Sequence, residues 1–483
     1  MKKMPNILFL MSDEHRFDVA GFAGNKIVRT KNLDWLAEDG CVFNNAYTPS
    51  PVCVPGRQSI LAGQLPKTCK CEGWFDLEPG YLTIPRYFSQ NSYYTIAAGK
   101  LHHEGIDQMQ GWIQRIGNDM KISPRFIENK NIPLCKENSR PFHETKWSDP
   151  KEIQEAKIGK AFHNKMDEYT VKGTIDFIDE YFLNSHYDRE KLNHQSLFLK
   201  VSLLQPHYPY TAEEEKFNYY LNRVPLYENQ KLFDHEFLSQ KRVVEGIDAT
   251  RRQIQKATAA YYAMVEKVDD LFGEVLESLR NAGQNLDEWI IIYTTDHGDM
   301  LGEHGVWEKQ KFFEGSVKVP LIIRWPEKFK GNKKIFENVS LCDLYATLCE
   351  MCDLPTPENL DSRSLVPLMK DQKYSWNNEV ISQFSKYNQP LMKDESEDWE
   401  NMELKDYGNM NLMIKKDELK YQYYGPKISE VLFDLKVNPE ETINFINDSR
   451  YSEVITKFRK RASELGFGEN KNKNYINVGY NIN

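Results

Sequence analysis

The sequence lacks any long uninterrupted run of apolar residues. The first such run, Ile7–Met11, follows a lysine pair but meets charge at Asp13. It is too short for the hydrophobic region of a signal peptide, and no small-residue cleavage site follows it. No later segment approaches the ~20 apolar residues that a membrane helix needs. We therefore expect no signal peptide, no membrane partner and a cytoplasmic location.

The chain also lacks an excess of positive charge and a disulfide framework. Its net charge is −9 with both signs spread along the sequence, so no basic stripe indicates a nucleic-acid partner. An acidic protein that acts on anions must gather positive charge locally. The eight cysteines are scattered, unlike those of small secreted domains. Cys69 and Cys71 could bind a metal or form a redox pair, but we expect ordinary thiols in a loop.

Apolar strands and amphipathic helices alternate through most of the 483 residues. This order predicts an α/β fold in which helices cover both faces of a mixed, mostly parallel sheet. The predicted strands cover residues 5–11, 41–48, 93–98, 196–204, 289–295 and 319–326. The predicted helices cover residues 31–38, 81–90, 169–182 and 250–281.

Two parts of the chain depart from this alternation. Residues 105–165 are polar and irregular, and we interpret them as insertion loops that face the substrate. From about residue 371 short strands are separated by charged turns, and a helix follows over 453–465. The pattern predicts an α/β domain over 1–370 and a C-terminal subdomain with a small antiparallel sheet over 371–483.

Polar side chains follow several predicted strands at the point where each strand ends. Asp13 and Lys100 follow two strands of the first hundred residues. His207 and the Asp296-His297 pair follow two later strands. In α/β sheets, ligands bind beyond the carboxyl ends of the strands. We therefore expect these side chains to meet at one edge of the sheet.

The stretch from Cys53 to Arg57 carries the candidate nucleophile. Pro55 suits the first turn of a helix, because its missing N–H would be unpaired there anyway. Cys53 would then lie just ahead of a helix N-terminus, where backbone N–H groups and the helix dipole favour an anion. Arg57 could hold two oxygens of the same anion. The alternative interpretation is a buried thiol beside a surface arginine.

Acidic residues at two strand ends could assemble a divalent cation site. The candidate ligands are Asp13, Glu14, Asp296 and His297. Carboxylates with one imidazole suit Ca²⁺, Mg²⁺ or Mn²⁺ better than structural Zn²⁺, which prefers thiolate and imidazole. We expect Ca²⁺ first, with Mg²⁺ or Mn²⁺ as alternatives. A single aspartate is usually solvated or caps a helix, but two matched strand ends favour a metal.

Basic side chains could form a positive wall at the same edge. Together with a metal, such a wall stabilises charge on a transferred group. His102 or His207 could also protonate a leaving oxygen. The candidates for the wall are Arg57, Lys100, His102, His207 and Lys309. We interpret His15, His143, His163, His186, His194 and His235 as ordinary core or surface residues.

These segments also resemble a known family. CVPGR at residues 53–57 matches the C-x-P-x-R signature of the type I sulfatases, within the alkaline-phosphatase-like superfamily. NILFLMSDEH, AAGKLHH and QPHYPY are similar to that family's first metal strand, its Gly-Lys-x-His segment and its Pro-His-x-Pro turn. TTDHGDMLGEHGVWEKQKFFEGSVKVPLII is similar to its second metal strand and to the lysine-bearing segment after it. The resemblance covers nearly the whole chain and is closest to the choline-sulfatase-like branch.

The resemblance implies a sulfuric ester hydrolase that releases sulfate from a sulfate monoester. Cys53 would be oxidised to formylglycine by a maturase, and the formylglycine hydrate would be the nucleophile. The implied metal ligands are Asp13, Glu14, Cys53, Asp296 and His297. The groups implied to hold sulfate and assist its transfer are Arg57, Lys100, His102, His207 and Lys309.

The sequence departs from the family pattern at a few positions. Glu14 stands where the family usually has Asp or Gln, and His297 where relatives have Asn or His. His102 and His103 compete for one role, because relatives differ by one residue in that spacing. Ser362 replaces the glycine of the usual Asp-Gly-x-Ser.

The sulfated alcohol stays open between a carbohydrate, an aryl alcohol and choline. Aromatic side chains could stack on a sugar or cage a cation, with ordinary packing as the alternative. The aromatic candidates are Trp74, Phe75, Tyr208, Tyr210 and Trp307. The predicted substrate contacts are His103, Tyr208 and Trp307.

Two other functions stand beside the sulfatase hypothesis. One is a phosphonate monoester or phosphodiester hydrolase of the same superfamily, which would use the same metal and nucleophile. The other is a non-catalytic binder of sulfated glycans. The oligomeric state is left open.

Overall fold

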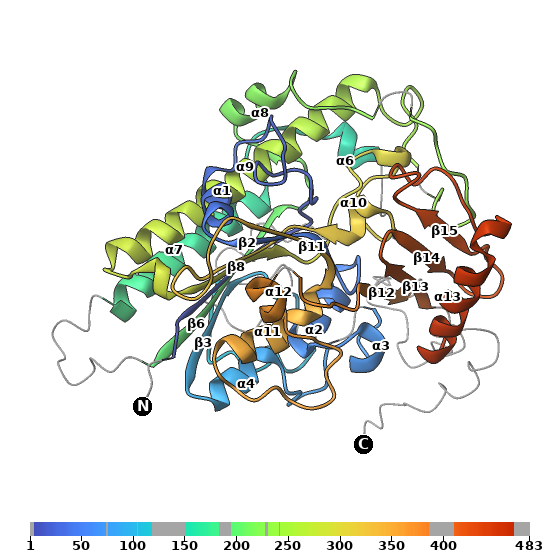
Figure 1. Cartoon of the computed structure of the whole chain (residues 1–483). Helices are drawn as coiled ribbons and strands as arrows, with labels where there is room; N and C mark the ends of the chain where they lie inside the picture. Colours follow the sequence, from blue (N-terminus) through green and yellow to red (C-terminus); the bar gives the residue numbers. More distant parts are fainter. Residues whose placement is uncertain are drawn as a thin grey trace.

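The computed structural model describes most of the chain as two sheets with flanking helices (Figure 1). The described residues are 4–73, 76–103, 105–117, 150–182, 195–227, 230–240, 242–371, 373–385 and 410–467. Trp74, Phe75 and most of the predicted insertion loops, residues 118–149, lie outside them. A short pairing of β5 (Lys157–Ile158) with β7 (Thr211–Ala212) stands apart from both sheets.

The larger sheet occupies the centre of the molecule. Its path in the described residues is β11 (Lys333–Ser340), β2 (Cys41–Tyr47), β10 (Leu321–Arg324), β8 (Ile290–Thr295), β1 (Ile7–Asp13), β6 (Ser196–Pro206), β3 (Tyr93–Gly99) and β4 (Gln114–Ile116). Strands β8, β1, β6, β3 and β4 are parallel, whereas β10 runs antiparallel to both neighbours. β9 (Lys318–Val319) also pairs with β2. The predicted mixed, mostly parallel sheet is confirmed.

The register of the central strands brings two predicted metal ligands together. Ser12 in β1 is the partner of Thr295 in β8. Asp13, the last residue of β1, and Asp296, the first residue after β8, therefore emerge at the same edge. This is the geometry that the parallel arrangement predicts.

Both faces of the larger sheet are buried, as the apolar run of β1 requires. Its side chains alternate: Phe9 and Met11 belong to one core, and Leu8 and Leu10 belong to the other. Figure 1 shows the helices that cover the two faces. The first core includes α2 (Cys53–Ala62), α4 (Ile84–Gln90), α11 (Leu344–Met351) and α12 (Val366–Lys370). The second includes α1 (Lys31–Glu38), α7 (Phe162–Phe182) and α9 (Arg251–Asn281).

The two long helices follow the sequence pattern to different degrees. α9 begins where predicted, with Thr250 forming a capping box with Gln253. α7 begins at Phe162, ahead of the predicted start at residue 169. Its first turns bury His163, Asn164 and other polar residues, so the apolar periodicity is missing there. The remaining short helices are α3 (Pro66–Cys69), α6 (Pro150–Gln154), α8 (Glu214–Tyr220) and α10 (Glu314–Val317). β4, α6 and β5 fall in the stretch predicted to be irregular.

The C-terminal region forms the smaller, antiparallel sheet that was predicted. Its order is β12 (Glu379–Ser385), β13 (Met410–Lys416), β14 (Leu419–Tyr423) and β15 (Val431–Asp434), with α13 (Ser452–Glu464) against it. Apolar side chains of this sheet, including Phe384 and Phe433, share a core with Phe312 and Phe313. The smaller sheet therefore braces the segment that follows Lys309. The domain boundary near residue 370 stays a prediction.

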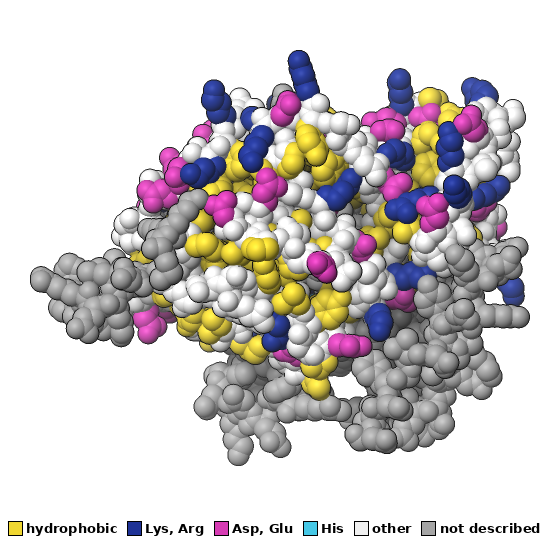
Figure 2. Space-filling model, turned by 60° about the horizontal axis from the view of Figure 1, so that its bottom comes forward, with side chains coloured by type: hydrophobic (Ala, Val, Ile, Leu, Met, Phe, Trp, Pro, Cys, Tyr) yellow, Lys and Arg dark blue, Asp and Glu magenta, His cyan; other side chains and the backbone are white. Residues whose placement is uncertain are grey.

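The surface carries charges of both signs. On the face in Figure 2, Lys and Arg are interspersed with Asp and Glu, and apolar side chains lie between them. None of the described helices combines the length and the apolar character that a bilayer span requires.

Candidate active site

Cys53 occupies the first position of α2. The prediction that it lies just ahead of the helix is wrong by one residue, because Val52 is the extended N-cap residue. Pro55 follows in the first turn, as expected. The Cys53 side chain is 1% exposed. Burial raises the pKa of its thiol to about 12, although Lys309 opposes the shift.

Three potential metal-ligating side chains surround the sulfur of Cys53. Ligand atoms of Asp13, Cys53, Asp296 and His297 all lie within 4.8 Å of one another. The Cys53 Sγ is 3.1 Å from the His297 Nε2 and 3.9 Å from the Asp13 Oδ1. Three separate segments, the end of β1, the start of α2 and the end of β8, supply these atoms. The structure thus brings together Asp13, Asp296 and His297 as the sequence predicted, whereas Glu14 falls in a second group with Asp13 and His207.

The hydrogen bonds of His297 suit a neutral ligand. Its Nδ1 lies 3.0 Å from the carbonyl oxygen of Gly298, which fixes the proton on Nδ1. The Nε2 then presents a lone pair toward the sulfur and the carboxylates, at 3.8 Å from oxygens of Asp13 and Asp296. Burial lowers the pKa of His297 to about 3, so the ring is uncharged at neutral pH.

Arg57 reaches the cluster from the next turn of α2. Its Nε donates to the Asp296 Oδ2 at 2.7 Å, and its Nη1 donates to the Ser202 Oγ and the Lys100 carbonyl at 2.9 Å each. Its Nη2 is buried without a hydrogen-bond partner, 3.6 Å from the Asp13 Oδ2. Burial alone would raise the pKa of Asp296, but Arg57 lowers it below the usual range. One terminal nitrogen of Arg57 is therefore left to contact an anion.

Two lysines pair with the remaining acids. The Lys100 ammonium donates to the Asp13 Oδ2. The Lys309 ammonium donates to the Glu14 Oε2 at 2.7 Å, and the His207 Nε2 lies 3.4 Å from the same oxygen. Burial raises the pKa of Glu14 well above its usual range, against the effect of Lys309. The other Glu14 oxygen, Oε1, is buried and has no hydrogen-bond partner among the described residues.

His207 is held by its own turn and by α7. Its Nδ1 lies 2.7 Å from the Tyr208 carbonyl oxygen, which turns Nε2 toward Glu14. Burial lowers the pKa of His207 well below its usual value, and Lys309 and Lys100 add to the shift. On α7, the Asp167 carboxylate accepts the N–H groups of Leu204 and Gln205 at 2.7 and 3.0 Å, just ahead of His207.

Four other predicted site residues are buried. His102 is 4% exposed and has a φ of 60°. His103 is bound to the following loop through its Nδ1, 3.0 Å from the Gln108 carbonyl oxygen. The Tyr208 ring lies 4.3 Å from the His207 ring, and the Lys309 ammonium is 5.7 Å from its centre. Trp307 packs edge-on against Tyr210 inside the core.

The structure also assigns partners that sequence reasoning missed. Ser202 accepts from Arg57, Asp167 holds the His207 turn, and the His163 ring lies 5.6 Å from the His207 ring. The one available signal was polarity at buried positions. Ser202 interrupts an apolar strand, and His163 and Asp167 lie on the buried face of α7.

The donor set fits a hard divalent cation. The carboxylates of Asp13 and Asp296 lie beside the neutral imidazole of His297, and Asp13 also groups with Glu14 and His207. Such oxygen-rich sets suit Ca²⁺, Mg²⁺ or Mn²⁺. The unpartnered Glu14 Oε1 is a buried acceptor that a cation would satisfy.

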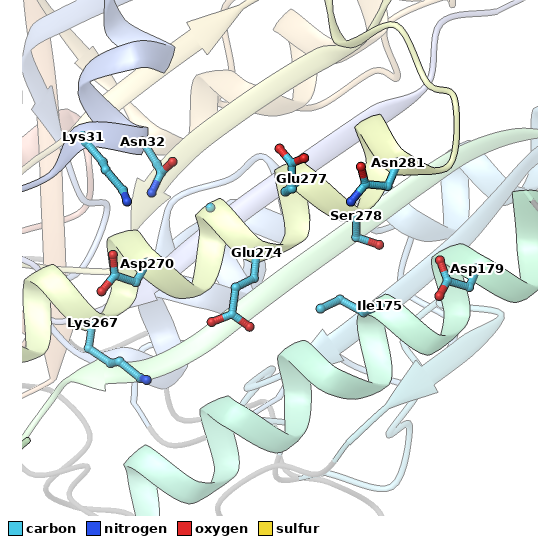
Figure 3. Close-up of a pocket in the computed structure, with 11 residues that line it drawn as sticks. Lys31, Asn32, Ile175, Asp179, Lys267, Asp270, Glu274, Glu277, Ser278 and Asn281 are labelled. Carbon is cyan, nitrogen blue, oxygen red and sulfur yellow. The ribbon is translucent and has the colours of Figure 1, made fainter.

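Two other hollows lie away from this cluster. One, of about 860 Å³, lies between α7 and α9 and is lined by acidic residues such as Asp179 and Glu274, with Lys267 (Figure 3). The second, of about 1030 Å³, lies at the opposite edge of the larger sheet, beside Asn6 and Trp289. Neither includes a residue of the candidate site.

Comparison with known families and curated proteins gives a consistent picture. The Sulfatase family matches residues 5–354, and the C-terminal part of N-sulphoglucosamine sulphohydrolase matches residues 302–466. An arylsulfatase of Clostridium perfringens is 29% identical over 484 positions, which cover 94% of this chain and 93% of the relative. A choline-sulfatase of Rhizobium meliloti is 29% identical over 381 positions, which cover 76% of this chain and 71% of the relative.

Solved structures share the fold. The phosphonate monoester hydrolase of Agrobacterium radiobacter superposes with a TM-score of 0.75 at 20% identity, covering 96% of this chain and 95% of that chain. A protein solved with its substrate D-glucosamine-2-N,6-O-disulfate superposes with a TM-score of 0.72 at 17% identity, covering 98% and 100%. At these identities the likeness concerns the architecture alone, and it confirms the expected alkaline-phosphatase-like fold.

Proposed function

This chain belongs to the sulfatase family and is a sulfuric ester hydrolase, and from that premise we propose that it cleaves the sulfate monoester of a carbohydrate or a small organic alcohol. The observation that carries the proposal is the buried group of Asp13, Cys53, Asp296 and His297, with ligand atoms within 4.8 Å of one another. It joins an oxidisable sulfur to a candidate cation site and to a wall of basic side chains.

The charge balance of the cluster suits an anionic substrate. The acids Asp13, Glu14 and Asp296 face the bases Arg57, Lys100 and Lys309, so their formal charges cancel. A divalent cation would add positive charge to this group of side chains. Charge on a transferring sulfate group spreads over its non-bridging oxygens, by analogy with phosphoryl transfer, and fixed positive groups stabilise it.

We propose Ca²⁺ as the cation, with Mg²⁺ or Mn²⁺ as alternatives. The residues that would hold it are Asp13, Glu14, Asp296 and His297, together with the oxidised Cys53. When bound, a divalent cation lowers the pKa of a hydroxyl at the site. The unpartnered Glu14 Oε1 and the orientation of the His297 Nε2 support this assignment.

We propose that Cys53 acts after oxidation to formylglycine by a maturase. The unmodified thiol has a pKa raised to about 12 and is a poor nucleophile at neutral pH, because the reactive form is the thiolate. The formylglycine hydrate supplies one hydroxyl for attack on sulfur and a second whose proton loss allows sulfate to leave.

The leaving alkoxide needs a proton from a neighbouring group. The His207 Nε2 and the Lys309 ammonium both lie at the Glu14 Oε2, so both point into the same part of the site. We assign the proton donor to Lys309, with His207 and His102 as the alternatives, because the lowered pKa of His207 and the contact of its Nδ1 with the Tyr208 carbonyl leave its Nε2 without a proton at neutral pH. His103, Tyr208 and Trp307 stay predicted contacts of the alcohol.

The first test is the state of Cys53. The protein is expressed with and without a formylglycine-generating maturase, and the tryptic peptide that ends at Arg57 is weighed. We expect a mass lower by roughly 18 Da, the change from thiol to aldehyde, together with aryl sulfate turnover that tracks the modified fraction. Full turnover by unmodified protein would contradict the nucleophile assignment.

The second test separates sulfate from phosphonate chemistry. The same modified protein is assayed on an aryl sulfate and on the matching aryl phosphonate monoester. We expect the higher kcat/KM on the sulfate. A clear preference for the phosphonate would assign the chain to the alternative activity, and binding of sulfated glycans without turnover would assign it to a non-catalytic role.

A further inference from the structure

The backbone of Glu14 has an unusual conformation that is held from both sides. Its φ is 64°, in the left-handed region that residues with a side chain rarely adopt. Its N–H donates to the Asp296 Oδ1 at 3.2 Å. Its carbonyl oxygen accepts from the Tyr261 hydroxyl at 2.5 Å. One of these two contacts comes from a candidate metal ligand, and the other comes from a residue that no sequence motif indicated.

Tyr261 makes a second contact with the same turn. Its hydroxyl oxygen accepts the N–H of Arg16 at 2.7 Å, so one hydroxyl binds the peptide groups on both sides of His15. Tyr261 is fully buried in the middle of α9, within a core that includes Tyr262 and Val265. The helix therefore holds the hydroxyl at a fixed place relative to the sheet.

We propose that Tyr261 is a positioning residue of the cation site, and this proposal rests on the function proposed above. By fixing the Glu14 peptide, the Tyr261 hydroxyl directs the Glu14 carboxylate toward Lys309 and leaves its Oε1 for the cation. Within the described residues, the Tyr261 hydroxyl bonds the backbone of this turn and no side chain, so it acts through Glu14.

Tyr261→Phe removes the hydroxyl and keeps the ring in the core. The carbonyl of Glu14 and the N–H of Arg16 then lose this partner. Loss of groups that orient metal ligands typically lowers metal affinity or activity by about 10–100-fold. We expect the Kd for Ca²⁺ to rise about tenfold and kcat/KM on an aryl sulfate to fall by a similar factor.

Tyr262→Phe is the matched control. Tyr262 is the next residue of α9, is 2% exposed and accepts a hydrogen bond from the Asn25 side chain at 3.2 Å. Its loss removes one buried hydroxyl from the same helix but leaves the Glu14 turn intact. We expect its Ca²⁺ affinity and its turnover to match the wild type.

The experiment measures two quantities in the full-length protein. After chelation of metals, hydrogen exchange followed by mass spectrometry reports the amides of residues 12–19. CaCl₂ is then titrated calorimetrically into the wild type, Tyr261→Phe, Tyr262→Phe, Glu14→Gln and the Tyr261→Phe/Glu14→Gln double variant. We expect Tyr261→Phe to show faster amide exchange and weaker Ca²⁺ binding than the wild type. Tyr262→Phe should show neither change. Because Tyr261 acts through Glu14, the double variant should bind within about twofold of Glu14→Gln.

Other outcomes overturn the proposal in distinguishable ways. Unchanged Ca²⁺ affinity in Tyr261→Phe, or a full additive loss in the double variant, contradicts the role of Tyr261 and leaves the cation site standing. A wild type that binds none of Ca²⁺, Mg²⁺ and Mn²⁺ contradicts the cation site itself, and the role of Tyr261 fails with it.

Discussion

Two of the buried charge clusters in the described part of the chain differ in what they leave unpaired. The candidate active site at the end of β1 pairs its acids with Arg57, Lys100 and Lys309. A second cluster, here called the sheet-junction cluster, consists of Tyr47, Glu314, Lys420 and Glu441 between α10 and the smaller sheet. Both are withdrawn from water, so burial of ion pairs alone does not mark a functional site.

Both carboxylates of the sheet-junction cluster pair with the Lys420 ammonium. The Glu314 carboxylate accepts from the Lys420 ammonium at 2.9 Å with one oxygen and from the Tyr47 hydroxyl at 2.9 Å with the other. The Glu314 N–H in turn donates to the Glu441 carboxylate at 2.7 Å. Within the described residues, the Glu441 Oε1 has no hydrogen bond but is ion-paired with Lys420, and the Arg57 Nη2 of the active site is likewise ion-paired with Asp13. The Glu14 Oε1 has neither a hydrogen bond nor an ion pair with any described residue. This buried acceptor near Cys53 is the feature that indicates a ligand.

The largest effect that would separate the two clusters is expected from Cys53→Ala. Loss of the nucleophile should lower kcat/KM on an aryl sulfate by about 10⁴-fold or more, with little change in the free energy of unfolding. Initial rates and urea denaturation of maturase-treated protein measure both quantities. Cys349→Ala, which removes a buried thiol of α11, is the control and should keep its turnover. Normal turnover by Cys53→Ala would contradict the comparison.

Lys420→Met should show the opposite behaviour. It leaves two buried carboxylates without their cation, which costs about 3–5 kcal/mol of unfolding free energy. The activity per folded molecule should change little, because Lys420 contacts no candidate ligand. Lys416→Met, at a partly exposed position on the neighbouring strand, should change stability by less than about 0.5 kcal/mol. Equal free energies of unfolding for the two variants would show that the sheet-junction cluster does not stabilise the fold.

Ser202→Ala tests the support of Arg57. The Ser202 hydroxyl accepts from the Arg57 Nη1, and hydrogen bonds to charged groups contribute about 1.5–3 kcal/mol. We expect kcat/KM to fall about tenfold, mainly through KM if Arg57 binds the sulfate oxygens. Ser196→Ala, at the other end of β6, removes a hydroxyl that bonds the Met4 carbonyl and should leave kinetics unchanged. Identical kinetics for both variants would remove Ser202 from the site.

The smallest expected effect concerns pH and His304. This ring stacks on Phe313 at 4.0 Å, and burial lowers its pKa to about 3, with Arg242 and Lys420 adding to the shift. In the unfolded chain His304 binds a proton near pH 6.5, whereas in the folded chain it does not. The contribution of His304 to the free energy of unfolding is therefore present above about pH 6.5 and is lost as the pH falls. Between pH 7 and pH 5.5 it amounts to about 1 kcal/mol.

His304→Asn should therefore flatten the pH dependence of the unfolding free energy by that amount. Asparagine is chosen because His304 has a φ of 55°, and asparagine tolerates this region. Urea denaturation at both pH values measures the difference, and parallel pH profiles for the two proteins would contradict the assignment.

The sequence predicted the parts of the site that depend on strand ends. Asp13, His207 and Asp296 could be placed because apolar runs define buried parallel strands, whose carboxyl ends must share an edge. The start of α2 was predicted one residue late, since the Pro55 signal identifies a first turn but not its N-cap.

The supporting residues could not be predicted, for a physical reason. Tyr261 belongs to the apolar row of α9, and periodicity shows that it faces inward but not that its hydroxyl meets the Glu14 carbonyl. Ser202 and Asp167 likewise face inward at positions where a pattern expects apolar side chains. Such contacts join residues far apart in the chain, and only the packed fold brings them into range.

The burial of Cys53 determines when this residue can be modified. Because Cys53 is only 1% exposed, a modifying enzyme cannot reach it in the folded protein. If the cysteine is converted to an aldehyde, we expect the conversion to take place while α2 is still an extended strand of nascent polypeptide. Chains that fold before the conversion would then persist as folded protein with an unmodified cysteine and no activity.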